Sequence, residues 1–123
     1  MPELRVLLVD DEEELVGTLA ERLALRGYDV TYLLDGAEAV RRAAQEPFDV
    51  LVLDVMMPGM NGLEVLKEVK RARPEIPVIL LTGRGSEQDS QTGLELGAFD
   101  YIMKPVKIDR LIEIMLKAVG ANG

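Results

Sequence analysis

Three carboxylates follow two apolar segments of the chain, at points where a parallel sheet would bring them together. Asp10 and Asp11 follow Val6–Val9, and Asp54 follows Asp49–Leu53, which is almost continuously apolar and β-branched. Such runs are typical of strands buried on both faces of a parallel sheet. Open α/β sheets form their binding and catalytic sites at the carboxyl ends of their strands, and the charge of Asp54 lies at such an end. We therefore expect Asp54 to be the reactive centre.

The residue types at this predicted site favour a hard cation. Three ionised carboxylates at close range repel one another, so they raise pKa values or recruit a metal ion. The chain has no Cys and no His, which excludes disulfides, thiolate metal sites and imidazole catalysis. Oxygen ligands remain, and Mg²⁺ fits them because it commonly binds one or two carboxylates together with a substrate phosphate.

A simpler interpretation of the first acidic pair is helix capping. Asp is favoured at helix N-termini, and acids in the first turn complement the helix dipole. On this interpretation Asp10 and Asp11 satisfy the start of the next helix, and Glu12, Glu13 and Glu14 serve that helix end alone. The pair gains weight as a metal site only in combination with Asp54.

Two further polar residues follow later predicted strands. Lys104 comes after Tyr101–Met103, and Thr82 comes after Val78–Leu81. A lysine at a strand end beside an anionic crevice could contact a phosphoryl oxygen as a point charge. The Thr82 hydroxyl could donate a hydrogen bond to the same group, although it could equally serve a turn. The Lys104–Pro105 bond could be cis or trans.

Apolar runs alternate with helical patterns along the whole chain of 123 residues, which suits one domain with a core from about 4 to 119. This alternation predicts α/β architecture: a doubly wound five-stranded parallel sheet of order 2-1-3-4-5, flavodoxin-like (βα)5, in a three-layer sandwich. Predicted strands cover 6–9, 28–33, 49–53, 78–81 and 101–103, and predicted helices cover 12 to about 26, 36–45, 63–71, 86–96 and 107 to about 119.

The composition limits the possible partners. The net charge is −8, from 22 acidic and 14 basic residues, which argues against direct binding of nucleic acid or anionic lipid by this domain. No apolar stretch approaches membrane-spanning length, and the N-terminus lacks a signal-peptide pattern. We therefore expect a cytoplasmic location and no membrane partner.

Four motifs together resemble the response-regulator receiver domain of bacterial two-component signalling, over essentially the whole chain. The matching residues are Leu7–Asp11, Leu53–Gly62, Leu81–Thr82 and Asp100–Pro105. The resemblance implies that Asp54 is the phosphoacceptor and that Lys104 contacts the phosphoryl group.

The same resemblance implies the other roles in the site. Asp10 and Asp11 would position Mg²⁺ together with Asp54, aided by the backbone carbonyl of Met56. Thr82 and Tyr101 would form a switch pair. A carboxylate is an acceptable nucleophile for phosphoryl transfer when a metal and a cation offset the transferred charge, so a chain without His can do this chemistry.

The resemblance to receiver domains also implies which partners the chain would have. The donor would be a phosphohistidine on a sensor histidine kinase or a histidine phosphotransfer protein, and small acyl phosphates often substitute. The chain would catalyse only its own phosphorylation and dephosphorylation, so it is not expected to be an enzyme in the ordinary sense. Phosphorylation would shift the face formed by 86–96, 101–103 and 107–119. That shift would control a downstream protein target or a missing output domain, with a phosphorylation-dependent homodimer as one possibility.

Some residues depart from the family pattern. Val106 replaces the Phe that most often follows Lys-Pro, which should alter packing and not chemistry. The segment 82–98 resembles receivers joined to winged-helix DNA-binding domains, which often dimerise through charged pairs. Ser90 and Ile114 stand at positions that are typically basic in those receivers, so the usual charged dimer is not expected in its usual form.

The sequence supports three other functions less well. A Mg²⁺-dependent phosphohydrolase with an aspartyl intermediate would need a second acid two residues after Asp54, where Met56 stands. A flavodoxin-like nucleotide or flavin site would need a glycine-rich loop after the first strand, where Asp10-Asp11-Glu12 would repel phosphate. A degenerate receiver used only for docking would not need all the matching residues.

Overall fold

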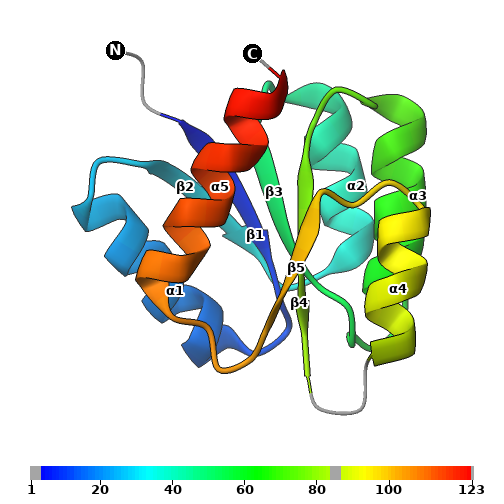
Figure 1. Cartoon of the computed structure of the whole chain (residues 1–123), viewed down its shortest axis with the longest axis horizontal. Coiled ribbons are helices and arrows are strands. Elements are labelled where there is room, and N and C mark those ends of the chain that lie inside the picture. Colours follow the sequence, from blue (N-terminus) through cyan, green and yellow to red (C-terminus); the bar gives the residue numbers. More distant parts are fainter. Residues whose placement is uncertain (1–3, 84–86, 123) are drawn as a thin grey trace.

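The computed structural model describes residues 4–83 and 87–122, which form five β–α units in succession (Figure 1). Ser86, the predicted first residue of the fourth helix, lies outside the described residues. The elements are β1 (Arg5–Val9), α1 (Glu13–Leu25), β2 (Asp29–Leu33), α2 (Gly36–Gln45), β3 (Val50–Asp54), α3 (Gly62–Ala72), β4 (Val78–Thr82), α4 (Glu87–Glu95), β5 (Asp100–Met103) and α5 (Ile108–Asn122).

The sheet has the predicted order and direction. Its strands run β2-β1-β3-β4-β5, and every neighbouring pair is parallel. This order confirms the doubly wound, flavodoxin-like sheet, and it places β1 beside β3. The carboxyl ends of β1, β3, β4 and β5 therefore meet along one edge of the sheet.

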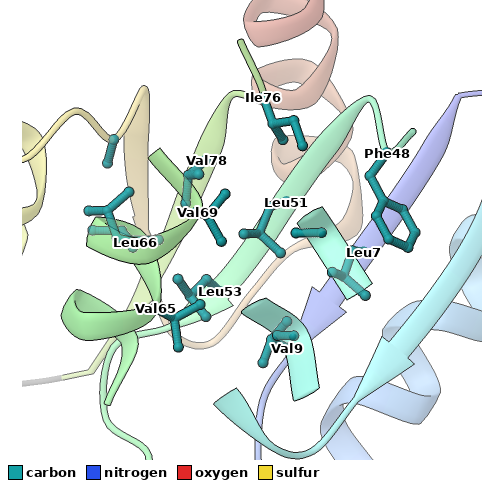
Figure 2. Packing of buried hydrophobic residues seen from close by; sticks show 14 of the residues in the cluster. Leu7, Val9, Phe48, Leu51, Leu53, Val65, Leu66, Val69, Ile76 and Val78 are labelled. Atoms are coloured by element: carbon teal, nitrogen blue, oxygen red, sulfur yellow. The ribbon is translucent and has the colours of Figure 1, made fainter. Parts of the chain in front are cut away.

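Helices cover both faces of the sheet (Figure 1). One face packs against α1 and α5, and the other packs against α2 and α3, with α4 beside β4 and β5. The central strands β3 and β4 are buried throughout because side chains on both of their faces lie under helices. Figure 2 shows the hydrophobic core on the face covered by α2 and α3, where Leu51 and Leu53 of β3 face Val65 and Val69 of α3.

Local signals explain where several helices begin and end. Asp35 and Asn61 cap α2 and α3, and each side chain accepts a hydrogen bond at 3.0 Å from the backbone N–H three residues on. After α1 ends, Gly27 has φ +93°, which favours glycine. The cap at Asn61 also anchors the loop that leads from β3 into α3.

The fourth helix is docked through small residues. Its buried residues are Ser90 and Gly93, and a Cβ at Gly93 would run into the Leu80 side chain of β4. Gly93, a poor helix former by propensity, therefore allows α4 to approach the sheet closely. Because few apolar side chains hold α4, it is a weakly anchored element.

None of the described helices is long and apolar enough to cross a membrane.

Candidate functional site

Asp10 and Asp54 lie at the same level on neighbouring strands. Val9 of β1 is paired with Leu53 of β3, so the residues that follow them come side by side. Asp54 is the last residue of β3, and Asp10 directly follows β1. The exposed fraction is 0% for Asp10 and 3% for Asp54. Two of the three predicted carboxylates are thus buried together at the carboxyl edge of the sheet.

Each carboxylate is held by a backbone N–H two residues further along the chain. Asp10 Oδ1 accepts from the Glu12 N–H at 2.9 Å, and Asp54 Oδ1 accepts from the Met56 N–H at 3.1 Å. These bonds fix one oxygen of each carboxylate in its own turn. The Oδ2 atoms of both residues are left to face Lys104.

Lys104 supplies the cation at the centre of the site. Its Nζ donates hydrogen bonds to Glu12 Oε1 at 2.9 Å and Asp54 Oδ2 at 3.2 Å, and it lies 3.2 Å from Asp10 Oδ2. Lys104 follows β5, and its backbone N–H donates to the Thr82 carbonyl at 2.7 Å, which ties it to the end of β4. The Lys104–Pro105 peptide bond is cis.

The surroundings shift the pKa of Lys104 upward. Burial by itself lowers the pKa of this ammonium, but the hydrogen bond with Glu12 and the charges of Asp10 and Asp54 more than offset it. Lys104 is therefore a permanent positive charge at any physiological pH.

Asp54 has a pKa raised to about 6. Burial is the largest cause, because it penalises the ionised form, and the charge of Asp10 adds to it. The positive charge of Lys104 and the Met56 N–H lower the pKa, but they compensate only in part. Keeping Asp54 ionised at neutral pH therefore costs free energy in the metal-free protein.

Glu12 is the site residue that sequence reasoning missed. We expected it to serve only the start of the first helix, yet it makes no side-chain capping bond at that position and contacts Lys104 instead. No local pattern could have signalled this contact, because the two residues are 92 positions apart. Asp10 does not cap α1 through its side chain either, since its Oδ1 binds the Glu12 N–H.

Asp11 and Met56 occupy the edge of the site. Both are exposed, and Asp11 is not among the described acids whose oxygens converge. The proposed roles of Asp11 and of the Met56 carbonyl as metal ligands stay predictions.

The residues present fit a hard cation. Among residues 4–83 and 87–122, Asp10, Glu12 and Asp54 can each offer one carboxylate oxygen, and these oxygens lie within 4.8 Å of one another. Asp10 Oδ2 is buried and makes no hydrogen bond, so its ion pair with Lys104 leaves a lone pair free for a ligand. An all-oxygen donor set of this kind suits Mg²⁺.

Thr82 and Tyr101 lie on the neighbouring strands β4 and β5, and Thr82 directly follows Leu81, the partner of Asp54 in the sheet. Thr82 is fully buried, and its Oγ1 has no hydrogen-bond partner in the described part of the chain. A buried hydroxyl without a partner is costly, which suggests that it gains a partner in another state of the protein. Tyr101 of β5 is 39% exposed and so presents part of its ring to solvent.

The receiver-domain resemblance is borne out by comparison with known proteins. The family model described as "Response regulator receiver domain" matches residues 6–116. The sensory transduction protein RegX3 of Mycobacterium tuberculosis is 45% identical over 118 residues, which cover 96% of this chain and 51% of RegX3. The alkaline phosphatase synthesis transcriptional regulatory protein PhoP of Bacillus subtilis is 42% identical over 115 residues, which cover 94% of this chain and 48% of PhoP.

A solved structure agrees over nearly the whole chain. A CheY-like response regulator receiver domain protein from Methanospirillum hungatei superposes with a TM-score of 0.93 at 30% identity, covering 98% of this chain and 97% of that one. The chain spans about half the length of the curated relatives it matches.

Proposed function

The chain belongs to the response regulator receiver domain family, and on that premise we propose that it is a signalling switch phosphorylated on Asp54. Receiver domains of this family take part in phosphorylation-dependent signalling. The observation that carries the proposal is the burial of Asp54 beside a second carboxylate, with Lys104 Nζ 3.2 Å from Asp54 Oδ2.

The chemistry is a displacement at phosphorus. A carboxylate oxygen of Asp54 forms the new O–P bond while the P–N bond of a donor phosphohistidine breaks, and the electron pair leaves on the imidazole nitrogen. Asp54 needs no general base when it is ionised, because the attacking oxygen carries no proton. Lys104 stays close to the acceptor oxygen and offsets the charge that the phosphoryl group brings.

Asp10 and Asp54 would hold Mg²⁺, with Asp11 and the Met56 carbonyl as the further ligands that the family implies. The metal would supply additional positive charge to the phosphoryl oxygens. The donor histidine must lie outside this chain, because the chain has no His. A sensor histidine kinase or a phosphotransfer protein fits that requirement.

The output is a population shift of the α4–β5–α5 face. A phosphoryl group on Asp54 offers new acceptor oxygens, which would give the buried Thr82 hydroxyl the partner it lacks. Movement of Thr82 would then allow Tyr101 to turn inward from its exposed position. The small-residue docking of α4 supports its role as the element that moves.

The partner surface lies on the same face. Tyr101, Met103, Lys107 and Arg110 line a pocket of about 300 Å³ together with Ile102 and Pro105, and Leu116 of α5 is 51% exposed. Exposed apolar side chains around a pocket are typical of interaction sites. We propose that this face binds an output domain, a downstream target or a second copy of the chain.

Two residues bear on how a dimer would form. Ser90 and Ile114, at the positions that are typically basic in related dimers, are 3% and 1% exposed. Neither side chain carries a charge or is exposed to a partner, so a dimer of this chain would have to use other contacts.

Labelling with acetyl phosphate tests the proposal. We expect Mg²⁺ and acetyl phosphate to add one phosphoryl group per chain, seen by intact mass, and hydroxylamine to remove it because an acyl phosphate is labile. A chelator should prevent the labelling. A wild-type protein that is never labelled would contradict the proposed function, and multi-turnover phosphate release from a general phosphate ester would favour a phosphohydrolase.

Replacing Lys104 by Ala should separate phosphorylation from output. We expect the labelling rate to fall about 10- to 100-fold, because one charge that stabilises the transferred group is lost. Some phosphorylation should persist, but the phosphorylation-dependent NMR shifts of Tyr101 and of α4 should disappear. Lys67→Ala is the control, since this lysine is exposed on α3. Normal shifts in Lys104→Ala would exclude a role for Lys104 in the switch.

A further inference from the structure

Glu12 reaches across the site to a lysine, although its own helix does not use its side chain. It stands at the N-cap of α1 without a capping bond, and its Oε1 lies 2.9 Å from Lys104 Nζ. That distance is the shortest of the three from Lys104 Nζ to a carboxylate oxygen. The Glu12 side chain is 61% exposed, and an exposed ion pair contributes little to stability. A contribution to folding therefore does not explain the contact.

The proposed reaction places a demand on Lys104 that Glu12 can meet. Lysine has a long flexible stem with large rotamer entropy and three N–H donors. Within residues 4–83 and 87–122, Lys104 contacts three carboxylates, and two of them, Asp10 and Asp54, are the groups that a cation and a phosphoryl group would engage. Glu12 is the remaining contact that could hold the ammonium in place while they do so.

Glu12 is itself fixed relative to the carboxylates. Its backbone N–H donates to Asp10 Oδ1 at 2.9 Å, so its position follows that of the buried Asp10. Glu12 thus links the loop after β1 to Lys104 after β5. A side chain held in its reactive position before the reaction need not lose its freedom during the reaction, which lowers the barrier.

We propose that Glu12 is a positioning residue for Lys104, which it holds over the acceptor oxygen of Asp54 during phosphoryl transfer. The inference rests on the proposed function and adds a residue to it. Glu12 acts through Lys104 in this proposal, and the Mg²⁺ affinity measured below distinguishes this role from that of a metal ligand, which its carboxylate could also fill.

A double-mutant cycle tests the proposal. We expect Glu12→Ala to lower the initial rate of labelling by acetyl phosphate about three- to ten-fold, as suits loss of one partly exposed charged hydrogen bond. In a Lys104→Ala background, the same substitution should change the rate by less than about twofold, because its effect depends on the lysine. Glu12→Gln should keep most of the wild-type rate, since its amide oxygen can still accept from Lys104.

Glu13→Ala is the matched control. Glu13 is the next residue and is exposed in the first turn of α1. Glu13→Ala removes one negative charge, as Glu12→Ala does, but it leaves the Glu12–Lys104 contact in place. The labelling rate should therefore stay within about twofold of wild type. An unchanged rate in Glu12→Ala, or an equal loss in both backgrounds, would overturn the proposal.

Two measurements that do not depend on turnover complete the test. Mg²⁺ affinity by calorimetry should change less than about threefold in Glu12→Ala, and a loss of more than about tenfold would make Glu12 a metal ligand instead. NMR relaxation of the Lys104 Cε should show greater mobility in Glu12→Ala than in Glu13→Ala, and equal mobility would also overturn the proposal. If wild type is not labelled but the lysine loosens, the proposed function fails while the Glu12–Lys104 link stands.

Discussion

Replacing Asp54 by Asn is expected to abolish phosphorylation and, in the same protein, to raise the stability of the metal-free fold. The loss of labelling should be complete, because the amide is not a nucleophile toward phosphorus under these conditions. The gain in stability follows from the raised pKa of Asp54, which stands at about 6 in the folded protein. Its ordinary value is 3.8, so ionisation costs about 3 kcal/mol at neutral pH.

The pH dependence has a definite sign. Between the ordinary pKa of 3.8 and the folded pKa of about 6, the folded state binds more protons than the unfolded state does. Asp54 therefore contributes stability that is fully present below the lower value and is lost as pH rises through the higher one. The amide in Asp54→Asn does not titrate, so the advantage of the variant should be small near pH 4 and reach about 1–3 kcal/mol above pH 6.

Urea unfolding of wild type and Asp54→Asn in a chelator, at pH 4 and pH 7, measures this difference. Mg²⁺ should stabilise wild type more than the variant, because the variant lacks one carboxylate ligand. Asp49→Asn provides the control for loss of one acidic charge away from the site, since Asp49 binds the Arg5 backbone N–H at the opposite edge of the sheet. A variant that is less stable than wild type at pH 7 would contradict the proposed cost of ionising Asp54.

The fold and the positions of Asp10 and Asp54 were predictable because the pattern of apolar residues determines which segments form the parallel sheet. Apolar runs such as Val78–Leu81 are typical of interior strands of a parallel sheet, and the alternation of strands and helices leaves few topologies. Once the order 2-1-3-4-5 is expected, Asp10 and Asp54 must be neighbours. The placement of Asp10 and Asp54 thus follows from strand ends alone.

Other features depend on contacts that no local pattern encodes. Glu12 belongs to a run of acids that suits a helix start, and its bond to Lys104 depends on how two distant loops meet. Gly93 is a poor helix residue by propensity, but its packing on Leu80 is visible only in three dimensions. Sequence reasoning fails in such places because it assigns a residue to its own element and not to the neighbour that it touches.

Gly62 is the clearest case of a residue whose importance is three-dimensional. It is the buried first residue of α3, and its N–H donates to the Val55 carbonyl at 3.0 Å. A Cβ added here would lie 2.6 Å from the Val55 Cα and 2.9 Å from the carbonyl carbon of Asp54. Both are backbone atoms of the segment that carries the acceptor, so neither can rotate away.

Gly62→Ala is therefore expected to cost about 2–4 kcal/mol of unfolding free energy, because α3 or the end of β3 must move. Gly17→Ala is the matched control: Gly17 lies inside α1, and a Cβ there meets nothing within 4 Å. Helix propensity favours alanine inside a helix, so the control should gain about 0.5–1 kcal/mol. The difference between the two variants isolates the contact with the β3 backbone.

Gly62→Ala should also slow the phosphorylation of Asp54. Displacing Asp54 and Val55 would move the acceptor carboxylate relative to Lys104, and small misplacements of reacting groups cost large factors in rate. We expect labelling of folded Gly62→Ala by acetyl phosphate to fall at least about tenfold, while Gly17→Ala keeps the wild-type rate. Urea unfolding and labelling below the transition measure the two effects separately. If Gly62→Ala is as stable and as reactive as Gly17→Ala, the close approach of α3 to the acceptor strand does not constrain this site.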